Sequence, residues 1–307
     1  IFSVYHLYWI FHGTAVFKGG LFKDFSSALF YRQEFRKPPF HHNNFYKAPL
    51  LGKERGGMNM KLVLAEPKFF KESISIVSDL VTEAKFKFNK NGLELVAMDA
   101  ANVAMVIFKM LSSCFTQYEV KEEEELAINL NSLKQILRRA KGEDILTLET
   151  TEDSRLKIIL KSNTLRSFTI STLELESKEQ KVPELSFPVN VEMDSTTFSD
   201  SMEDVSVVAE SVTLLGEKNL LAIKAEGDLS KAYIEIKPDE NTVIKVDVDD
   251  KFKAKYSLEY LKKMVAGGKL ADKVSLHFNT DYPLRIDYKL IDKLSLSFIL
   301  APRVDND

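Results

Sequence analysis

Apolar residues recur at helical spacing in four stretches of this chain. Steps of four, three and one residues place them on one face of a helix, while charged residues such as Lys71, Glu72 and Arg138 fill the opposite face. The apolar faces form two matching pairs at an offset of 128 residues: Phe70, Ile74 and Val77 match Phe198, Met202 and Val205, and Leu133, Ile136 and Leu137 match Leu261, Met264 and Val265. The pattern predicts four amphipathic helices in a chain that repeats itself.

Between the helices, apolar and polar residues alternate with the period of two that is typical of β-strands. This alternation is clear at 93–98 and at 244–249, and turn-forming residues occupy 89–92, 142–144 and 279–281. The strands keep the offset of 128 in the pairs Leu148 and Leu276, Leu156 and Leu284, Ile158 and Ile286, Phe168 and Leu296, and Ile170 and Phe298. We therefore expect a duplicated α+β chain, in which each half lays two helices on one face of an antiparallel sheet.

The stretch 173–193 joins the two halves. Its front is acidic and polar without a strict period, and Pro183 and Pro188 cannot donate hydrogen bonds to a neighbouring strand. We expect an extended connection here, neither a helix nor a central strand. The expected organisation is a first domain at 60–172, a linker at 173–193 and a second domain at 194–307.

Residues 1–59 differ in composition from the rest of the chain. They hold 14 of the 32 aromatic residues, the only tryptophan and four of the five histidines. The apolar run 1–11 is too short to span a bilayer and lacks the basic leader of a secretory signal. The run 53–57 can be encoded entirely by purine codons, as a ribosome-binding site ahead of Met58 or Met60 would be. We expect a non-native or disordered extension, with a tethered aromatic arm as the alternative.

Without this extension the chain is acidic. From residue 60 onward it holds 34 basic and 42 acidic residues, a formal charge of −8. The single cysteine, Cys114, excludes an internal disulfide and a metal site built on cysteines, and it suits a reducing compartment. His277 has no Ser or Cys partner at readable spacing, and 267–269 lacks the flanking residues of a phosphate-binding loop. The sequence therefore disfavours an enzyme, and it predicts no metal and no cofactor.

Four runs of sequence carry a family resemblance. They are NGLELVAMDAANVAM at 91–105, INLNSLKQILRRAKGEDILTLE at 128–149, YPLRIDYKL at 282–290 and LSFILAPRVDND at 296–307. Together they resemble the sliding DNA clamps of the proliferating cell nuclear antigen family, especially the archaeal members, almost throughout 60–307. The resemblance implies the duplicated DNA-clamp fold and a closed trimeric ring. It also implies that the ring encircles duplex DNA at the cytoplasmic nucleoid and tethers polymerases to it.

The number of helices agrees with a trimer. Twelve helices spaced about 9 Å apart give a circumference of roughly 110 Å and, after one helix diameter is subtracted, a hole of roughly 23 Å. Groove depths make a DNA duplex about 20 Å wide, so it fits this hole. Eight helices would leave only about 12 Å, which excludes a dimer.

Basic residues on the helices are expected to line the hole, because binding to phosphates requires Lys and Arg. The candidates are Lys71, Lys134, Arg138, Arg139, Lys141, Lys262, Lys263 and Lys269. The third helix departs from this pattern, because its polar face holds Ser199, Asp200, Ser201, Glu203 and Asp204. Either the charge of the hole is patchy, or the chain is one member of a mixed ring.

The resemblance further implies a client site beneath the linker. Clients of the family insert a short peptide with a glutamine, an aliphatic residue and paired aromatics, and the expected clients are DNA polymerase, the clamp loader, a flap nuclease and a ligase. The matching positions are Met98, Asn102, Val103, Met105, Val182, Pro183, Pro283, Ile299, Ala301, Pro302 and Val304. The rim of this pocket is more polar than usual, since 179–181 holds Glu, Gln and Lys.

Finally, the resemblance implies that a strand near 165–171 of one chain pairs with a strand near 231–236 of the next, because unpaired strand edges otherwise aggregate. The expected interface residues are Leu165, Arg166, Phe168, Ile170, Lys231, Tyr233 and Glu235. Arg166 and Lys231 carry charges opposite to that of Glu235, which predicts a salt-sensitive interface. The chain forms a homotrimer on this interpretation. A heterotrimer with related subunits, or a damage-response clamp that acts as a scaffold, is the alternative.

Overall fold

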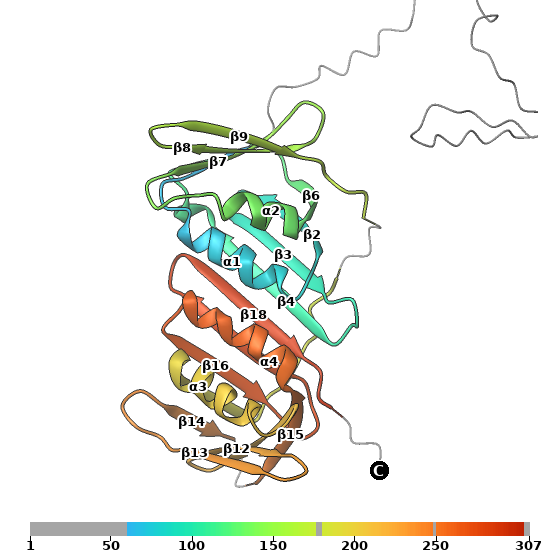
Figure 1. Cartoon of the computed structure of the whole chain (residues 1–307), viewed down its shortest axis with the longest axis vertical. Coiled ribbons are helices and arrows are strands. Elements are labelled where there is room, and N and C mark those ends of the chain that lie inside the picture. Colours follow the sequence, from blue (N-terminus) through green and yellow to red (C-terminus); the bar gives the residue numbers. More distant parts are fainter. Residues whose placement is uncertain (1–59, 176–179, 248–249, 304–307) are drawn as a thin grey trace, which may run out of the picture. The chain divides into compact units, whose positions relative to one another are not determined.

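The computed structural model describes residues 60–175, 180–247 and 250–303, so the extension expected at 1–59 lies outside the described residues. Its α-helices lie in front of the strands in Figure 1. They are α1 (Lys68–Ser78), α2 (Leu130–Leu137), α3 (Ser195–Ser206) and α4 (Leu258–Met264), with the short 3-10 helices η1 (Ser112–Cys114) and η2 (Val265–Lys269). Among the described residues, no helix has the length and apolar character needed to cross a bilayer.

The strands form three sheets in which every pairing is antiparallel. The five-stranded sheet has the order β5 (Gln117–Val120), β1 (Met60–Leu64), β7 (Ile145–Thr150), β8 (Leu156–Lys161) and β9 (Leu165–Ile170). The four-stranded sheet has the order β13 (Lys231–Ile236), β12 (Leu220–Glu226), β11 (Ser211–Glu217) and β15 (Phe252–Ser257). The nine-stranded sheet has the order β14 (Val243–Val246), β10 (Val189–Asp194), β16 (Lys273–Phe278), β17 (Leu284–Leu290), β18 (Leu294–Leu300), β4 (Ala104–Leu111), β3 (Gly92–Met98), β2 (Glu83–Asn89) and β6 (Glu124–Asn129).

The nine-stranded sheet belongs to both halves of the chain. Strand β4 of the first half pairs with β18 of the second half, from Met110 opposite Leu294 to Ala104 opposite Leu300. The expectation of one separate sheet for each half is therefore wrong, because the strands of each half are divided between two sheets and one of these sheets is shared. Period-two alternation shows that a segment is a strand, but it does not show which distant strand pairs with it.

The duplicated α+β fold itself is confirmed. The predicted apolar faces of the four helices are buried, except at Ile136 and Val265, which are half-buried against the same core. Strand β3 alternates as predicted, with Leu93, Leu95 and Ala97 buried. Strand β14 ends at Val246, so the alternation expected as far as residue 249 is confirmed only in part, and residues 248 and 249 lie outside the described residues.

The repeat offset of 128 fails in two places. Leu156 lies opposite Ile170, and its counterpart Leu284 lies opposite Leu300, so the offset from β9 to β18 is 300 − 170, or 130. Met98 lies opposite Met105, and its counterpart Glu226 lies opposite Lys231, so the offset from β4 to β13 is 231 − 105, or 126. The predicted pairs Phe168 with Leu296 and Ile170 with Phe298 are therefore wrong. A shift of two residues preserves the alternation, so the sequence pattern does not reveal it.

The linker is extended over most of its length. Residues 171–175 and 180–188 contain no helix or strand, and the backbone N–H of Leu173 donates to the carbonyl of Ala127 at 2.8 Å. The prediction of no central strand within 173–193 is wrong for the last five residues, which lie in β10 between β14 and β16. Residues 189–194 contain no proline, and alternate side chains from Val189 onward are buried, so this segment has the sequence of a strand.

Candidate functional site

The predicted basic residues all lie on one layer of helices or directly after a helix, since Arg138, Arg139 and Lys141 follow the end of α2 at Leu137. Helix α1 contacts α2 on one side and η2 on the other, and α3 contacts α4 and η2, so the helices of the two halves are adjacent (Figure 1). Five of the basic residues on this layer are exposed, namely Arg138, Arg139, Lys141, Lys262 and Lys269. Because these residues come from both halves, the helical layer presents positive charge along more than one helix.

The other three basic residues of the layer are half-buried and bind neighbouring helix atoms. Lys134 places its Nζ 2.5 Å from the Asp79 carboxylate and 3.2 Å from the carbonyl of Ser75. Lys71 donates to the carbonyl of Ala140 at 3.2 Å, and Lys263 lies 2.9 Å from the carboxylate of Glu259. Their charges are partly used within the chain, so Arg138, Arg139, Lys141, Lys262 and Lys269 are the stronger candidates for phosphate contact.

Helix α3 breaks the positive layer. Asp200, Glu203 and Asp204 are exposed there. Ser201 was expected on the same polar face, but it is buried, and its hydroxyl donates to the carbonyl of Thr197 at 2.7 Å. The charge of the helical layer is thus patchy, because the second half contributes one acidic helix, α3.

A second apolar cluster lies on the sheet face opposite the helices. Met98 on β3 lies opposite Met105 on β4, which in turn lies opposite Ile299 on β18, so the three side chains form one row across three strands. We call the outer cluster the set Val96, Met98, Met105, Ile107, Leu185 and Ile299. Leu185 comes from the linker, so the linker crosses this row and partly covers it.

The structure brings together only some of the residues expected in the client site. Met98, Met105 and Ile299 belong to the outer cluster, but Val103 packs against the main core. The backbone N–H of Ala301 donates to the carbonyl of Val103 at 2.9 Å, which joins the tail to the end of β3 and β4. Of the remaining expected residues, Asn102, Val182 and Pro183 are exposed, Pro283 and Pro302 are half-buried, and Val304 lies outside the described residues.

The residues that sequence reasoning missed are Val96, Ile107 and Leu185. A signal for Ile107 exists in β4, whose residues 104–108 are all apolar and all buried. A strand that is apolar on both faces must be covered on both faces. Leu185 gave a weaker signal, since the linker has no period from which its orientation could be inferred.

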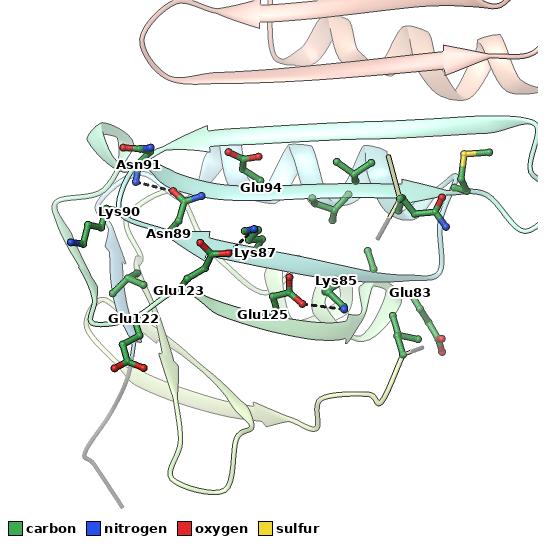
Figure 2. Close-up of a pocket in the computed structure, with 18 of the residues that line it drawn as sticks. Glu83, Lys85, Lys87, Asn89, Lys90, Asn91, Glu94, Glu122, Glu123 and Glu125 are labelled. Carbon is green, nitrogen blue, oxygen red and sulfur yellow. Dashed lines mark hydrogen bonds and ion pairs between the residues drawn. The ribbon is translucent and has the colours of Figure 1, made fainter. Parts of the chain in front are cut away.

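An open hollow of about 1050 Å³ lies beside the outer cluster, and Figure 2 shows the charged side chains of β2, β3 and β6 around it. Lys85 pairs with Glu125 at 3.1 Å and Lys87 pairs with Glu123. The linker contributes Leu175 and Gln180, and Met98 is the one expected client-site residue in the lining. The hollow therefore adjoins the outer cluster and has mixed charge.

A group of half-buried polar side chains continues the row of the outer cluster. Arg285 lies opposite Ile299, His277 opposite Arg285, and Asn190 opposite His277. Asp287, which is 3% exposed, accepts from Nε of Arg285 at 3.0 Å and lies 3.3 Å from Nε2 of His277. Burial raises the pKa of Asp287, but hydrogen bonds from His277 and Ser297 and the charge of Arg285 outweigh it and lower the pKa to about 2.

This polar group fixes the end of the linker. The side-chain amide of Asn190 donates to the carbonyl of Phe187 at 3.2 Å, while its oxygen lies 2.6 Å from Nδ1 of His277. The ring of Phe187 packs against His277 at a centroid distance of 5.8 Å. Leu185 and Phe187 therefore attach the linker at two neighbouring points of the outer sheet face.

Both of the expected interface strands are sheet edges. Strand β9 ends the five-stranded sheet and β13 ends the four-stranded sheet, with Leu165 67% exposed and Tyr233 53% exposed. The expected charge pairing across chains is not supported, since the charged groups have partners within the chain. Arg166 binds Asp144, Lys231 binds Glu226, and Glu235 accepts from the hydroxyl of Tyr233 at 2.9 Å.

No group of three or more His, Cys, Asp or Glu side chains within the described ranges is arranged to hold a metal ion.

Comparisons with known proteins match this architecture. The family model for the N-terminal domain of proliferating cell nuclear antigen matches residues 59–182, and the model for its C-terminal domain matches residues 181–303. A DNA polymerase sliding clamp of Nanoarchaeum equitans is 34% identical over 249 residues, which are 80% of this chain and 100% of the relative. The DNA polymerase sliding clamp of Pyrococcus furiosus is 32% identical over 248 residues, which are 81% of this chain and again 100% of the relative. The chain belongs to the proliferating cell nuclear antigen family.

Proposed function

We propose that this chain is the subunit of a DNA sliding clamp, in which three copies close into a ring around duplex DNA. The ring acts as a processivity factor: it tethers DNA polymerase to its template and performs no catalysis of its own. Membership of the family and the names of the relatives support this function. We place the clamp in the cytoplasm, at the nucleoid.

The observation that carries the proposal is the junction between the two halves. Within the chain, β18 pairs with β4. Strand β9 is the counterpart of β18 and β13 is the counterpart of β4, and both counterparts are sheet edges. A second copy of the chain can therefore add its β13 to β9 by the same pairing, and three such additions close a ring of six similar domains.

The register of this junction follows from the repeat. Within the chain Ser297 lies opposite Ile107 and Phe298 opposite Val106. Subtracting 130 from the β18 numbers and adding 126 to the β4 numbers places Ser167 opposite Tyr233, and Phe168 opposite Ala232, of the neighbouring copy. In this register all six residues of Leu165–Ile170 face residues 230–235, which match the length of the β13 edge.

The helical layer is the proposed inner surface of the ring. Its exposed cations, Arg138, Arg139, Lys141, Lys262 and Lys269, contact phosphates of either strand without reading the base sequence. Lys71, Lys134 and Lys263 contribute to the positive field from half-buried positions. Phosphate contact of this kind permits sliding, since it has no preferred position along the duplex.

The outer cluster and the linker form the proposed client site. A short client peptide with paired aromatic residues would bury them against Met98, Met105 and Ile299, between Leu185 of the linker and the tail at Ala301. The clamp loader, a flap nuclease and a ligase would use the same site as the polymerase. The first domain is then 60–172, and the second begins with β10 at Val189, so the segment between them serves as one wall of the site.

A cysteine cross-link tests the ring. The full chain with Ser167→Cys, Tyr233→Cys and Cys114→Ser should form a disulfide between neighbouring copies, because directly opposed antiparallel residues have the separation that a disulfide needs. Under mild oxidation we expect covalent trimers that stay on nicked circular DNA in high salt. Thr169→Cys with Tyr233→Cys is the matched control, whose cysteines are two positions out of register and should cross-link poorly.

The native mass gives the second measurement. A homotrimer has three times the chain mass of 35.0 kDa. A stable monomer, or trimers that form only with a related second subunit, would contradict the homotrimeric ring.

A further inference from the structure

The connection between β3 and β4 is organised around one carboxylate. Asp99 is 7% exposed. Its Oδ1 accepts from the backbone N–H groups of Val103 at 2.7 Å and Ala104 at 2.8 Å, and its Oδ2 accepts from Ala101 at 3.2 Å. Asn102 has a φ of 56°, in the left-handed region, so this tight turn needs the carboxylate to hold its amides in place.

The fourth donor to this carboxylate comes from the other half of the chain. The hydroxyl of Tyr260, on α4, donates to Oδ2 of Asp99 at 2.6 Å across 161 residues of sequence. Lys263 lies over the Tyr260 ring at 5.4 Å from the ring centroid, which restrains the ring on its helix. Burial raises the pKa of Asp99, but these hydrogen bonds outweigh it, so the pKa is lowered and the carboxylate stays charged.

The repeat shows that the fold does not require this hydrogen bond. The counterpart of Asp99 in the second half is Gly227, and the counterpart of Tyr260 on α2 is Ser132, so neither group is present there. The corresponding β12–β13 connection closes through the backbone N–H of Gly227 and the carbonyl of Ser230 at 2.9 Å. The hydrogen bond between Tyr260 and Asp99 therefore occurs only at the connection that lies beside the proposed client site.

We propose that Tyr260 is a positioning residue, which acts through Asp99 to hold residues 99–103 in the shape that receives a client peptide. The proposal rests on the proposed client site. Residues 99–103 follow Met98 of the outer cluster directly, and Val103 binds Ala301 of the tail, so the turn sets the distance between the row and the tail. A loosened turn would have to be ordered during binding, and client affinity would fall by the corresponding factor.

The test compares Tyr260→Phe with Tyr118→Phe in the full chain. Tyr118 is also half-buried, and its hydroxyl donates to a backbone carbonyl, that of Asn89, at 2.8 Å, so the control removes a similar group at a distance from residues 99–103. The probe is a synthetic peptide with a glutamine, an aliphatic residue and two adjacent aromatics. Because hydrogen bonds to charged groups are the stronger ones, we expect Tyr260→Phe to weaken binding by roughly tenfold. Tyr118→Phe should leave it unchanged within about twofold, the scatter expected of a distant site.

Amide hydrogen exchange distinguishes a local loosening of residues 99–103 from a general loss of stability. Exchange at Val103 and Ala104 should accelerate in Tyr260→Phe while the thermal midpoint and the native mass match those of Tyr118→Phe. Asp99→Ala combined with Tyr260→Phe should bind no worse than Asp99→Ala alone, since Asp99→Ala already removes the acceptor of the Tyr260 hydroxyl. Equal peptide affinity in Tyr260→Phe and the unmodified chain overturns the positioning role, and so does a loss explained by a lower thermal midpoint. Failure of the unmodified chain to bind the peptide overturns the proposed client site instead.

Discussion

Arg166, on the edge strand β9, donates through its guanidinium to the buried carboxylate of Asp144 and to the backbone carbonyl of Arg139, the latter at 2.9 Å. Arg139 follows the end of α2, so the edge strand and this helix are joined by one side chain. The hydrogen bonds from Arg166 and from the backbone of Lys141 lower the pKa of Asp144 to about 2. A residue expected to bind a neighbouring chain thus stabilises the edge of its own chain.

Arg166→Met should lower the thermal midpoint by several degrees, because it leaves the enclosed Asp144 carboxylate without its cationic partner. Arg155→Met is the matched control, since the pair of Arg155 and Asp153 is more than half exposed and should contribute little. The difference in midpoint between Arg166→Met and the unmodified chain should be fully present above the ordinary Asp pKa of 3.8 and should vanish as the pH falls towards 2, because the folded pKa of Asp144 is the lower one. Equal midpoints for the two variants at pH 7 would contradict this role of Arg166.

Charge reversal at Arg138 and Arg139 should weaken DNA association and flatten its salt dependence, by about 1 in the logarithmic slope for each phosphate that is no longer bound. The measurement is fluorescence titration of duplex DNA at several salt concentrations. Lys245→Glu with Lys289→Glu makes the same change of charge at exposed positions in β14 and β17, away from the helices, and should leave the slope unaltered. Lys134→Glu should chiefly lower stability, because it breaks the pair with Asp79. An unchanged slope in the Arg138 and Arg139 variant would mean that these side chains do not contact DNA.

The helices and most strands could be predicted because both carry their signal locally. The spacing of Phe70, Ile74 and Val77 defines one buried face, and the same spacing recurs at Phe198, Met202 and Val205. The counterpart of Ile170 could not be predicted, since a hairpin longer by two residues preserves the alternation of its strands. The sheet shared by the two halves could not be predicted either, because the pairing of β4 with β18 depends on contacts between distant segments.

Within the proposed client site, the sequence indicated which strand residues pack together on the outer sheet face more reliably than which linker residue packs on them. Met98, Met105 and Ile299 lie in strands whose faces follow from alternation. Val182 and Leu185 lie in a segment without a period, and Leu185 is the one that packs on the row. An extended segment with prolines does not show from its sequence which side chain faces the sheet.

Leu185→Asp and Met98→Asp should each weaken binding of an aromatic-ended peptide by roughly thirtyfold or more, because each places a charge against the peptide's aromatic anchors, whose loss commonly costs about 2 kcal/mol or more. Val182→Asp should have a smaller effect, because Val182 is 40% exposed and does not belong to the outer cluster. Calorimetric titration gives the affinities, and the native mass checks that the assembly is intact. Equal losses for Leu185→Asp and Val182→Asp would show that the linker turns a different side to the client.

Asp287 should give the chain a second acid-sensitive contribution to stability. Its folded pKa of about 2 is lower than the ordinary value of 3.8, so the contribution is present above about pH 4 and is lost as the pH falls towards 2. Asp287 is 3% exposed, and its lowered pKa corresponds to a contribution of roughly 2 kcal/mol to the free energy of unfolding. Denaturant unfolding of Asp287→Asn at pH 7 and pH 2.5 measures it, and the variant should differ from the unmodified chain far more at pH 7. An equal difference in unfolding free energy at both pH values would mean that Asp287→Asn destabilises the chain by disturbing its packing.

The seams of the proposed ring are unequal in strength. At each seam inside a chain, the pairing of β4 with β18 is reinforced by the covalent linker, by Leu185 on the outer cluster and by the hydrogen bond from Tyr260 to Asp99. At each seam between chains, β9 and β13 have their edge pairing and the side chains around it, without a linker or a counterpart of Asp99. A force that pulls the ring apart therefore separates one subunit from the next and leaves every subunit whole. In the proposed ring, DNA would then enter at a boundary between chains, which can separate and pair again without unfolding a subunit.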